Sequence, residues 1–311
     1  MTAPRIAVLC GPNLWHVDDL QRAAKLRGLR LETADPEKLR SECPSRPGAP
    51  QSVRCAGLEL TELDALLIRS VPGGSLEQVV YRMDTLETLR TAGVSVINPP
   101  KAVEAAVDKY LCLSRIHEAG LPVPRTIVCE DAKEALEAFD ELDGRALLKP
   151  LFGAEGHGIV RPENLAEARS AISELAADQG VFYLQEYIDH GGTDLRLFVI
   201  GEEVVASMRR KAPPGQWLTN ISQGSSAESV APGQELEALA LAATRAVGAE
   251  IAGVDIIEGP DGAPRVLEVN AIPGWRAISE VSGIDLALSV LDYTLARVAT
   301  LSSEPIGARQ S

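Results

Sequence analysis

Three oxygen-bearing side chains lie on two neighbouring segments near the C-terminal end of the chain: Asp255, Glu268 and Asn270. Residues 253–257 and 267–270 have the pattern of two strands joined by a Gly-Pro-Asp-Gly turn. Because side chains alternate along a strand, Glu268 and Asn270 are expected on one face, close to Asp255. Carboxylate and amide oxygens suit Mg²⁺ or Mn²⁺ better than zinc, and magnesium with few protein ligands usually awaits substrate phosphates. The pattern therefore indicates nucleotide chemistry.

A glycine-rich segment with Gly153, Gly156 and Gly158 follows a predicted strand that ends at Lys149. Glycines leave room for backbone N–H groups to cradle phosphate oxygens, and the lysine ammonium could reach the same phosphates. No helix begins at the third glycine and no Gly-Lys-Ser/Thr follows, so the segment is neither a dinucleotide fingerprint nor a P-loop. Alone, such a segment is a plain turn at least as often. The lysine and the downstream oxygen ligands favour a phosphate-binding loop.

Further polar residues follow on the next predicted strands. Residues 185–188 end a strand at a hinge that could offer backbone groups to adenine and the Glu186 carboxylate to a ribose hydroxyl. The alternative is a surface carboxylate beside a turn. Asp194 and Arg196 alternate onto one strand face, and residues 209–211 add three consecutive cations. A charge run is usually a solvated face, but beside a phosphate site such cations are candidates to stabilise a transferring phosphoryl group.

The N-terminal third alternates strands with helices, which indicates an α/β domain with a mostly parallel sheet. Ser75 followed by Gln78 has the pattern of a capping box at the start of a helix. A stretch rich in Pro, Ser and Gly at 41–57 is expected to be an exposed loop. The expected elements are strands at 5–10, 65–69 and 94–97 and helices at 18–28 and 75–92.

The rest of the chain is expected to form two more lobes. A helix over 101–119 would contain Asp108 and Lys109, which by themselves predict only a surface ion pair. Around the glycine segment we expect strands at 125–129 and 145–149 and helices at 131–142 and 163–178. After residue 182 we expect strands at 182–188, 194–200 and 203–210 and helices at 234–248 and 283–300. The predicted domains are 1–98, 99–184 and 185–301, with a flexible tail at 302–311.

Composition limits the class of function. The 311 residues suit two or three lobes, and the net charge of −14 argues against a nucleic-acid-binding protein, although a basic cleft inside an acidic shell stays compatible with it. No apolar run approaches the roughly 20 residues that span a membrane, and the N-terminus lacks a signal-peptide pattern. Five cysteines without a Cys-x-x-Cys pair indicate a reduced, cytoplasmic protein; a Cys43–Cys55 disulfide is the less favoured alternative.

The order of these motifs resembles the ATP-grasp superfamily, and more closely its RimK-type branch of α-L-glutamate ligases. The resemblance covers about residues 65 to 295 and is carried by Asp108-Lys109, Lys149-Pro150, the glycine segment, Gln185-Glu186-Tyr187-Ile188, Asp194-Leu195-Arg196, Asn220, Asp255 and Glu268-Val269-Asn270. Each motif is weak alone, but the ordered set is specific. The implied fold is mixed, α/β and α+β: an N-terminal pre-ATP-grasp α/β domain, then a two-lobed ATP-grasp domain with a small lid lobe and a C-terminal lobe.

The resemblance also implies roles for individual residues. The ATP-binding set would be Lys109, Lys149, Gly153, Gly156, Gly158, Gln185, Glu186, Tyr187, Ile188 and Asp194. Asp255, Glu268 and Asn270 would hold two Mg²⁺ (or Mn²⁺) ions. Arg210 and Arg196 would be the catalytic cations, with Arg210 stabilising an acyl phosphate and the tetrahedral intermediate formed from it.

The chain departs from the RimK-type pattern within residues 217–223. Leu218 stands where an arginine tends to precede the Ser/Thr-Asn pair, and Gln223 stands where a basic residue is usual. The loss of two cations shifts carboxylate binding to other residues, and the substrate candidates are Asn220, Lys211 and Arg276.

Two aromatic residues have an open interpretation. Trp275, beside Arg276, is a candidate for an acceptor site, but core packing explains a tryptophan there equally well. His16 follows the first strand at the expected mouth of the cleft and is equally an ordinary loop residue.

The resemblance predicts an ATP-dependent carboxylate–amine ligase that works through an acyl phosphate. It would add L-glutamate, or a similar amino acid, to a small molecule or coenzyme such as a pterin- or furan-type one-carbon carrier. The segments 75–78 and 271–275 resemble ligases of such coenzyme pathways. We expect a homo-oligomer without nucleic-acid or membrane partners. The alternatives are a peptide-type ligase of the glutathione synthetase kind and a non-catalytic ATP-binding regulatory module; the complete metal ligands and both lysines favour an enzyme.

Overall fold

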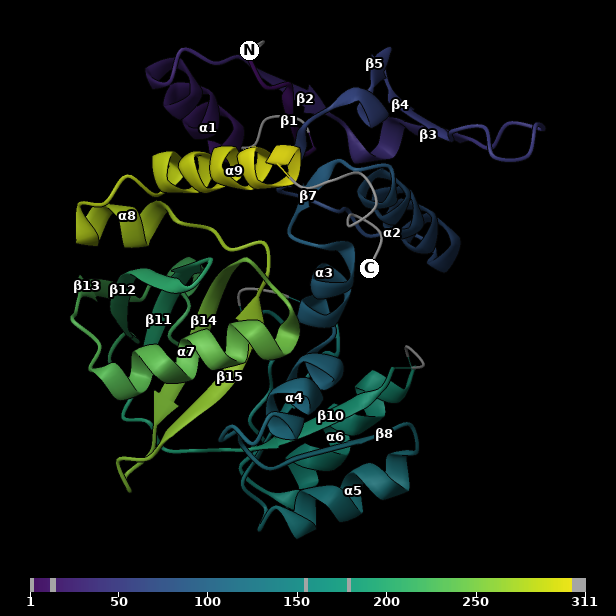
Figure 1. Cartoon of the computed structure of the whole chain (residues 1–311). Helices are drawn as coiled ribbons and strands as arrows, with labels where there is room; N and C mark the ends of the chain where they lie inside the picture. The colour runs from purple at the N-terminus through teal and green to yellow at the C-terminus, as the bar shows by residue number, and fades with distance from the viewer. Residues whose placement is uncertain (1–2, 12–14, 154–155, 178–179, 304–311) are drawn as a thin grey trace.

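The computed structural model describes residues 3–11, 15–153, 156–177 and 180–303. Residues 304–311, which belong to the predicted tail, lie outside the described residues. Figure 1 shows the N-terminal strands beside the last helix at one end, and two sheet-containing lobes at the other. The chain therefore returns to its N-terminal domain after completing both lobes.

A parallel sheet in the order β2-β1-β6-β7 forms the N-terminal part. Its strands are β1 (Ile6–Leu9), β2 (Leu31–Ala34), β6 (Ala65–Ile68) and β7 (Ser95–Ile97). Side chains alternate between its two faces. One face packs on α1 (Trp15–Leu26) and α9 (Leu286–Ser303), and the other on α2 (Leu76–Thr91) and α3 (Pro100–Val107). The predicted parallel α/β sheet is confirmed, as is the capping box of Ser75 and Gln78.

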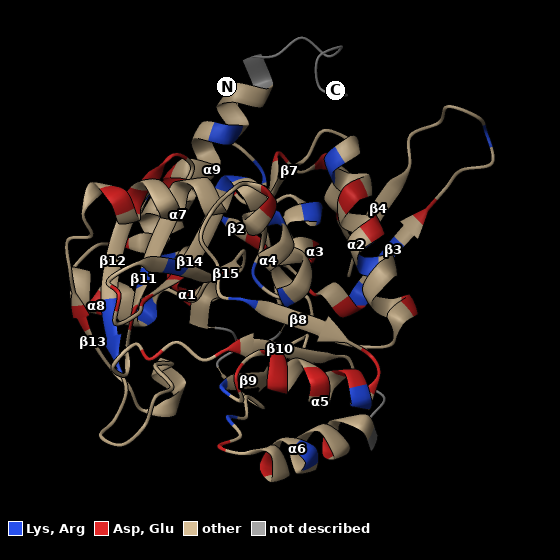
Figure 2. Ribbon diagram, turned by 90° about the horizontal axis from the view of Figure 1, so that it is seen from below, with Lys and Arg blue, Asp and Glu red and all other residues tan. Residues whose placement is uncertain are grey.

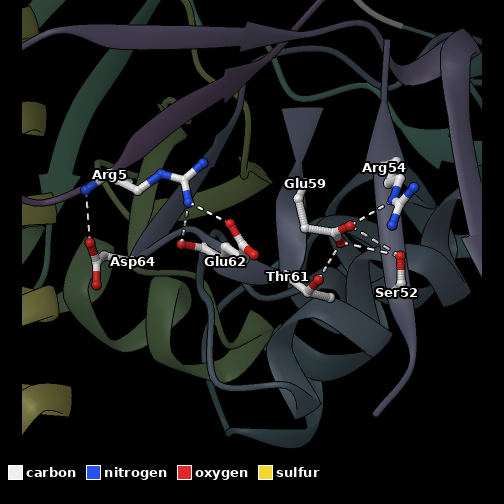
Figure 3. A network of polar contacts seen from close by, with 7 residues as sticks. All are labelled: Arg5, Ser52, Arg54, Glu59, Thr61, Glu62 and Asp64. Carbon is white, nitrogen blue, oxygen red and sulfur yellow. Dashed lines mark hydrogen bonds and ion pairs between the residues drawn. The ribbon is translucent and has the colours of Figure 1, made fainter. Parts of the chain in front are cut away.

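The predicted loop at 41–57 is wrong in part. Residues 41–42 and 52–55 of it belong to a small antiparallel sheet of β3 (Leu39–Glu42), β4 (Ser52–Cys55) and β5 (Leu58–Glu59), while residues 43–51 form no strand. The side chains of Val53 and Cys55 both point into the core, with an exposed residue between them. This alternation covers too few residues to indicate a strand among the surrounding Pro, Ser and Gly. Figure 3 shows how the Glu59 carboxylate holds this sheet, because it accepts hydrogen bonds from Ser52, Arg54 and Thr61.

A second sheet, in the antiparallel order β8-β10-β9, builds the small lobe. Its elements are β8 (Thr126–Cys129), α5 (Ala132–Glu141), β9 (Ala146–Lys149), α6 (Leu165–Ala177) and β10 (Phe182–Glu186). Helices α5 and α6 both pack on one face of this sheet, as the view in Figure 2 shows. Figure 2 also shows acidic and basic positions mixed along α2 and α5. None of the helices in the described part of the chain has the length and apolar character that a membrane crossing requires.

The predicted helix over 101–119 is wrong at its centre, because it divides into α3 and α4 (Lys109–Glu118). Asp108 has extended backbone angles, φ −87° and ψ 104°, and ends one helix while it caps the next. Its carboxylate accepts hydrogen bonds from the backbone N–H groups of Tyr110 (2.9 Å) and Leu111 (3.0 Å). Aspartate is a preferred N-cap residue, so the signal was present in the sequence. The break makes Lys109 the first residue of α4.

The third sheet is antiparallel in the order β13-β12-β11-β14-β15. Its elements are β11 (Thr193–Ile200), β12 (Glu203–Lys211), β13 (Ser226–Ser229), α7 (Gln234–Val247), β14 (Ile251–Glu258), β15 (Pro264–Asn270) and α8 (Arg276–Ser282). Short 3₁₀ turns occur at η1 (Pro36–Lys38), η2 (Leu60–Glu62) and η3 (Ile221–Gln223). Strand β13 and helix α8 were not predicted. Helix α7 covers one face of the sheet.

Asn98 fixes the end of β15 against the N-terminal sheet. Its side-chain amide donates hydrogen bonds to the carbonyls of Ile251 (2.7 Å) and Ala271 (2.5 Å). Its side-chain oxygen accepts from the N–H groups of Glu250 (2.6 Å) and Ile251 (2.8 Å). Both donor protons and both acceptor positions of this buried amide are thus used. The contact sets the position of the residues that follow the proposed metal ligands.

Candidate active site

Five charged residues of the five-stranded sheet lie on the face opposite α7. Apolar residues of β11, β14 and β15 point toward α7, and the residues between them point away. The strand register places Asp194 opposite Arg210 and Arg196 opposite Asp255. Asp255 lies opposite Glu268 in turn. Four neighbouring strands therefore bring five charged side chains together.

Two aspartates and two arginines in this group form a buried ion-pair network. Arg210 donates two hydrogen bonds to the Asp194 carboxylate, at 2.7 and 2.5 Å, and lies 3.0 Å from Asp255. Arg196 lies 2.6 Å from the other oxygen of Asp255. Thr219 donates to Asp194 at 2.6 Å. Asp194, Arg210 and Asp255 are each no more than 4% exposed, so the geometry of these groups is fixed by pairing.

Asp255, Glu268 and Asn270 occupy adjacent positions, as the sequence predicts. Asn270 lies opposite Gly253, two pairs along the same sheet face from Asp255 and Glu268. Burial, and then the neighbouring Asp255 charge, raise the pKa of Glu268. Two facing carboxylates in a buried site favour a bound cation, so this donor set fits magnesium. Within the described residues no group of three His, Cys, Asp or Glu side chains is placed to hold a metal ion.

Both predicted lysines lie in the cleft beside these carboxylates. The Lys109 ammonium donates to the carbonyl of Gly153 at 2.8 Å, and the Lys149 ammonium donates to the side-chain oxygen of Gln185 at 2.7 Å. Burial lowers the pKa of Lys109, and it lowers the pKa of Lys149 to about 8. The alternative of a surface ion pair for Asp108 and Lys109 is wrong, because Asp108 is used as a helix cap.

The glycine segment reaches across the cleft to the loop after β12. Gly156 has φ +74°, a conformation that favours glycine, and a Cβ built on it would lie 2.5 Å from the side-chain oxygen of Asn220. Its residues 154 and 155 lie outside the described residues. The contact shows that the segment approaches Asn220 more closely than any side chain at Gly156 would permit.

Most of the predicted site residues line a single cleft between the small lobe and the five-stranded sheet. They are Lys109, Lys149, Gly153, Gly156, Gln185, Glu186, Tyr187, Ile188, Asp194, Arg210, Asn220, Asp255 and Glu268. Gly158, Arg196, Asn270, Lys211 and Arg276 are outside this lining. Arg196 contacts Asp255 from within the sheet, Lys211 is exposed at the end of β12, and Arg276 lies on α8.

The hinge end of the cleft contains residues that the sequence did not reveal. The Arg161 guanidinium lies 3.7 Å from the centre of the Tyr187 ring, and Trp217 meets that ring edge-on at 6.1 Å. The Glu186 carboxylate accepts a hydrogen bond from the backbone N–H of Arg125 at 2.8 Å. Arg161 lies in a segment without a recognisable motif, and the sequence gives no role to Trp217 within residues 217–223, so only the fold brings the two side chains to Tyr187.

Trp275 does not line the cleft, and core packing accounts for it. It is 1% exposed, it packs on the N-terminal sheet and α9, and its indole N–H donates to Asp19 at 2.8 Å. His16, Arg69 and Arg276 surround it: His16 lies edge-on to its ring and Arg69 lies over the ring at 4.4 Å. Arg276 stacks on Trp15 at 4.6 Å.

Comparison with known proteins gives consistent matches. A model of the RimK-like ATP-grasp domain matches residues 106–294. Tetrahydromethanopterin:alpha-L-glutamate ligase of Methanosarcina acetivorans is 33% identical over 91% of this chain and 95% of its own length. A probable alpha-L-glutamate ligase of Shewanella frigidimarina is 32% identical over 95% and 96%. Among solved structures, the ATP-grasp ligase PsnB complexed with its minimal precursor has a TM-score of 0.75 at 23% identity, covering 94% of this chain and 98% of PsnB.

Proposed function

This chain belongs to the RimK-like ATP-grasp family of ATP-dependent ligases that form carbon–nitrogen bonds, and from that premise we propose that it joins the amino group of L-glutamate to a carboxylate of a pterin-type coenzyme. The observation that carries the proposal is a single cleft lined by both lysines, the Asp255–Glu268 pair and the buried Arg210. The choice of glutamate and of a pterin is supported by the name of the Methanosarcina acetivorans relative. The energy source is ATP, which becomes ADP and phosphate.

The reaction takes two displacements, because a carboxylate oxygen is a poor leaving group. A carboxylate oxygen attacks the γ-phosphorus, the bond from that phosphorus to the β–γ bridging oxygen breaks, and ADP leaves. The glutamate amine then attacks the acyl carbon. Phosphate leaves with the oxygen that the carboxylate supplied, and the nitrogen gives up a proton. One amide, one ADP and one phosphate result.

The cleft offers cations and backbone donors for the triphosphate. Lys109 and Lys149 project into it from α4 and from the end of β9, on the same side as Gly153 and Gly156. We assign both lysines to the phosphates, and the glycine segment to the cover over them. Glu186 and Tyr187, at the hinge, are assigned to the ribose and adenine. A covered site keeps water away from the acyl phosphate.

The paired carboxylates are assigned to the metal. Asp255 and Glu268, with Asn270, would hold Mg²⁺, or Mn²⁺ in its place, together with the phosphates, and we propose two ions. Bound magnesium would neutralise charge on the transferring phosphoryl group. Arg210 reaches the cleft with its guanidinium fixed between Asp194 and Asp255. We assign it to the acyl phosphate and to the oxyanion formed when the amine adds, with Arg196 supporting Asp255 from behind.

The proposal is tested by incubating the protein with ATP, Mg²⁺, L-glutamate and a panel of pterin carboxylates, with ADP and the mass of the product as readouts. We expect one acceptor to gain one or more glutamate residues. Glu268→Gln should lower turnover by about 1000-fold, since it removes a charge that positions the metal. Glu258→Gln, at the exposed end of β14, is the matched control and should stay active. If the protein formed no ADP with any acceptor of the panel, the proposed ligase function would be contradicted. A fully active Glu268→Gln variant would contradict the assignment of that carboxylate to the metal.

A further inference from the structure

The N-terminal sheet has a second place where a ligand is expected. From β1 the chain continues to β2 on one side, whereas β6 and β7 lie on the other side, so the strand order reverses between β1 and β6. In open parallel sheets ligands bind outside the carboxyl ends of the strands at such a switch point. Arg69 directly follows β6, and His16 lies in the first turn of α1, which follows β1. The proposed ATP cleft does not use this point.

Arg69 is a buried cation whose charge has no acidic partner among the described residues. It is 6% exposed, and its guanidinium donates one hydrogen bond, to the carbonyl of Pro273 at 2.6 Å. Its Nε is buried without a partner. Burial lowers the pKa of Arg69, and no carboxylate opposes that effect. A buried charge left in this state is costly, and such a group in a native protein calls for an explanation.

His16 and Arg276 extend the same cluster toward the surface. The His16 ring stacks on Trp15 at 3.7 Å, and both of its nitrogens are buried without hydrogen bonds in the described structure. Burial, then Arg69 and Arg276, lower the pKa of His16 to about 3, so the imidazole is neutral and keeps one N–H to donate. Arg276 is exposed at the start of α8. The three side chains therefore present hydrogen-bond donors and positive charge, and none of them is negatively charged.

This cluster lies directly behind the reaction site. Pro273, which accepts the Arg69 hydrogen bond, follows the proposed metal ligands of β15 by three residues. A Cβ built on Gly253 would lie 3.1 Å from Pro273 and would collide with Arg196. Arg69, Pro273, Gly253 and Arg196 thus form one continuous layer that ends at Asp255.

We propose that Arg69, His16 and Arg276 form a carboxylate subsite that holds a non-reacting carboxylate of one substrate. The inference rests on the proposed ligase function and adds to it the residues that recognise a substrate. It is compatible with Leu218 and Gln223, which stand where residues of the RimK-type pattern tend to be basic. The carboxylate could belong to the amino acid or to the acceptor, and the test separates the two sources.

The test uses Arg69→Gln and Arg276→Gln in the full chain. Calorimetric titration with glutarate reports carboxylate binding without turnover, and steady-state assays give KM for ATP, L-glutamate and the acceptor. We expect each variant to weaken glutarate binding by about tenfold or more, as loss of a charge-assisted hydrogen bond does. The KM of one carboxylate substrate should rise by a similar factor while the KM for ATP stays unchanged. The substrate whose KM rises is the occupant. Arg90→Gln, an exposed arginine of α2 paired with Glu87, is the control.

Arg276→Gln keeps the test decisive if Arg69→Gln fails to fold, because Arg276 is exposed. Folded variants with wild-type glutarate affinity and wild-type KM values for both carboxylate substrates would overturn the subsite. Failure of the ligase function has a different signature, namely a wild-type protein that forms no ADP with any acceptor. Glutarate binding that depends on Arg69 would support the carboxylate subsite even then.

Discussion

Arg210 and Arg69 are both almost completely buried, but their surroundings differ. Arg210 lies between two carboxylates on adjacent strands, and its hydrogen bonds to Asp194 fix its orientation. Arg69 lies on an indole ring and donates to one backbone carbonyl. Burying a charge costs several kcal/mol unless a partner offsets the cost. The ion pairs of Asp194, Arg210 and Asp255 therefore hold that network in place before any substrate arrives, whereas in our proposal the cluster of Arg69, His16 and Arg276 is completed by its ligand.

The largest effect on stability is expected from removing Arg210 from its ion pairs with Asp194 and Asp255. Arg210→Met leaves Asp194 as a buried carboxylate without its cation and leaves Asp255 paired with Arg196 alone, so the free energy of unfolding should fall by about 3–5 kcal/mol. Urea denaturation followed by circular dichroism measures this change. A variant with wild-type stability would show that the ion pairs of Arg210 do not stabilise the fold, and it would contradict the distinction drawn between Arg210 and Arg69.

A smaller effect is expected from Gly156→Ala, because the added methyl group would push the glycine segment away from Asn220 across the cleft. The added Cβ would meet the Asn220 side chain at 2.5 Å, so we expect the KM for ATP to rise by about tenfold. Gly215→Ala is the matched control, because Gly215 also has a positive φ, +77°, but has nothing within 4 Å of the added atom. Equal effects of the two variants would mean that backbone strain, and not the contact, is responsible.

The pH dependence of substrate binding should differ between Lys149 in the cleft and His16 beside Arg69. Lys149 holds its proton below its pKa of about 8, so kcat/KM for ATP should fall as pH rises through 8. The unfolded lysine keeps its proton up to about 10.5, so the contribution of Lys149 to stability should rise between these values. His16 stays neutral above its pKa of about 3, so carboxylate binding should show no histidine titration between pH 5 and 7. A step near pH 6.5 in the carboxylate KM would contradict the account of His16.

The smallest effect is expected from removing the unpaired charge. Arg69→Met deletes a buried guanidinium that no acid balances, so the free energy of unfolding should change by no more than about 1 kcal/mol. The same urea denaturation measures it. A loss as large as that of Arg210→Met would mean that Arg69 is a structural residue, and the contrast between the two arginines would fail.

The sequence predicts the paired region far better than the unpaired one. Glu268 and Asn270 are two residues apart on a strand, and Asp255 lies on the preceding strand, so periodicity alone brings them together. Arg69 carries no such signal, because an arginine after an apolar strand is ordinary in sequence. Its meaning depends on burial under Trp275, which joins segments about 200 residues apart.

Local rules that compete with each other explain the remaining differences. Asp108 lies within a continuous run of helix-forming residues, and its capping role overrides that run. Strand β4 is only four residues long and is set by packing of Val53 and Cys55 on the core. The β-propensity of so short a segment is decided by its neighbours.

The most direct test of the central claim follows oxygen from the carboxylate to phosphate. The protein is incubated with ATP, Mg²⁺, L-glutamate and an acceptor whose carboxylate is labelled with ¹⁸O, and the released phosphate is analysed by mass spectrometry. Activation as an acyl phosphate predicts that each phosphate carries one ¹⁸O atom from the acceptor. Unlabelled phosphate, or label found in AMP, would contradict the account.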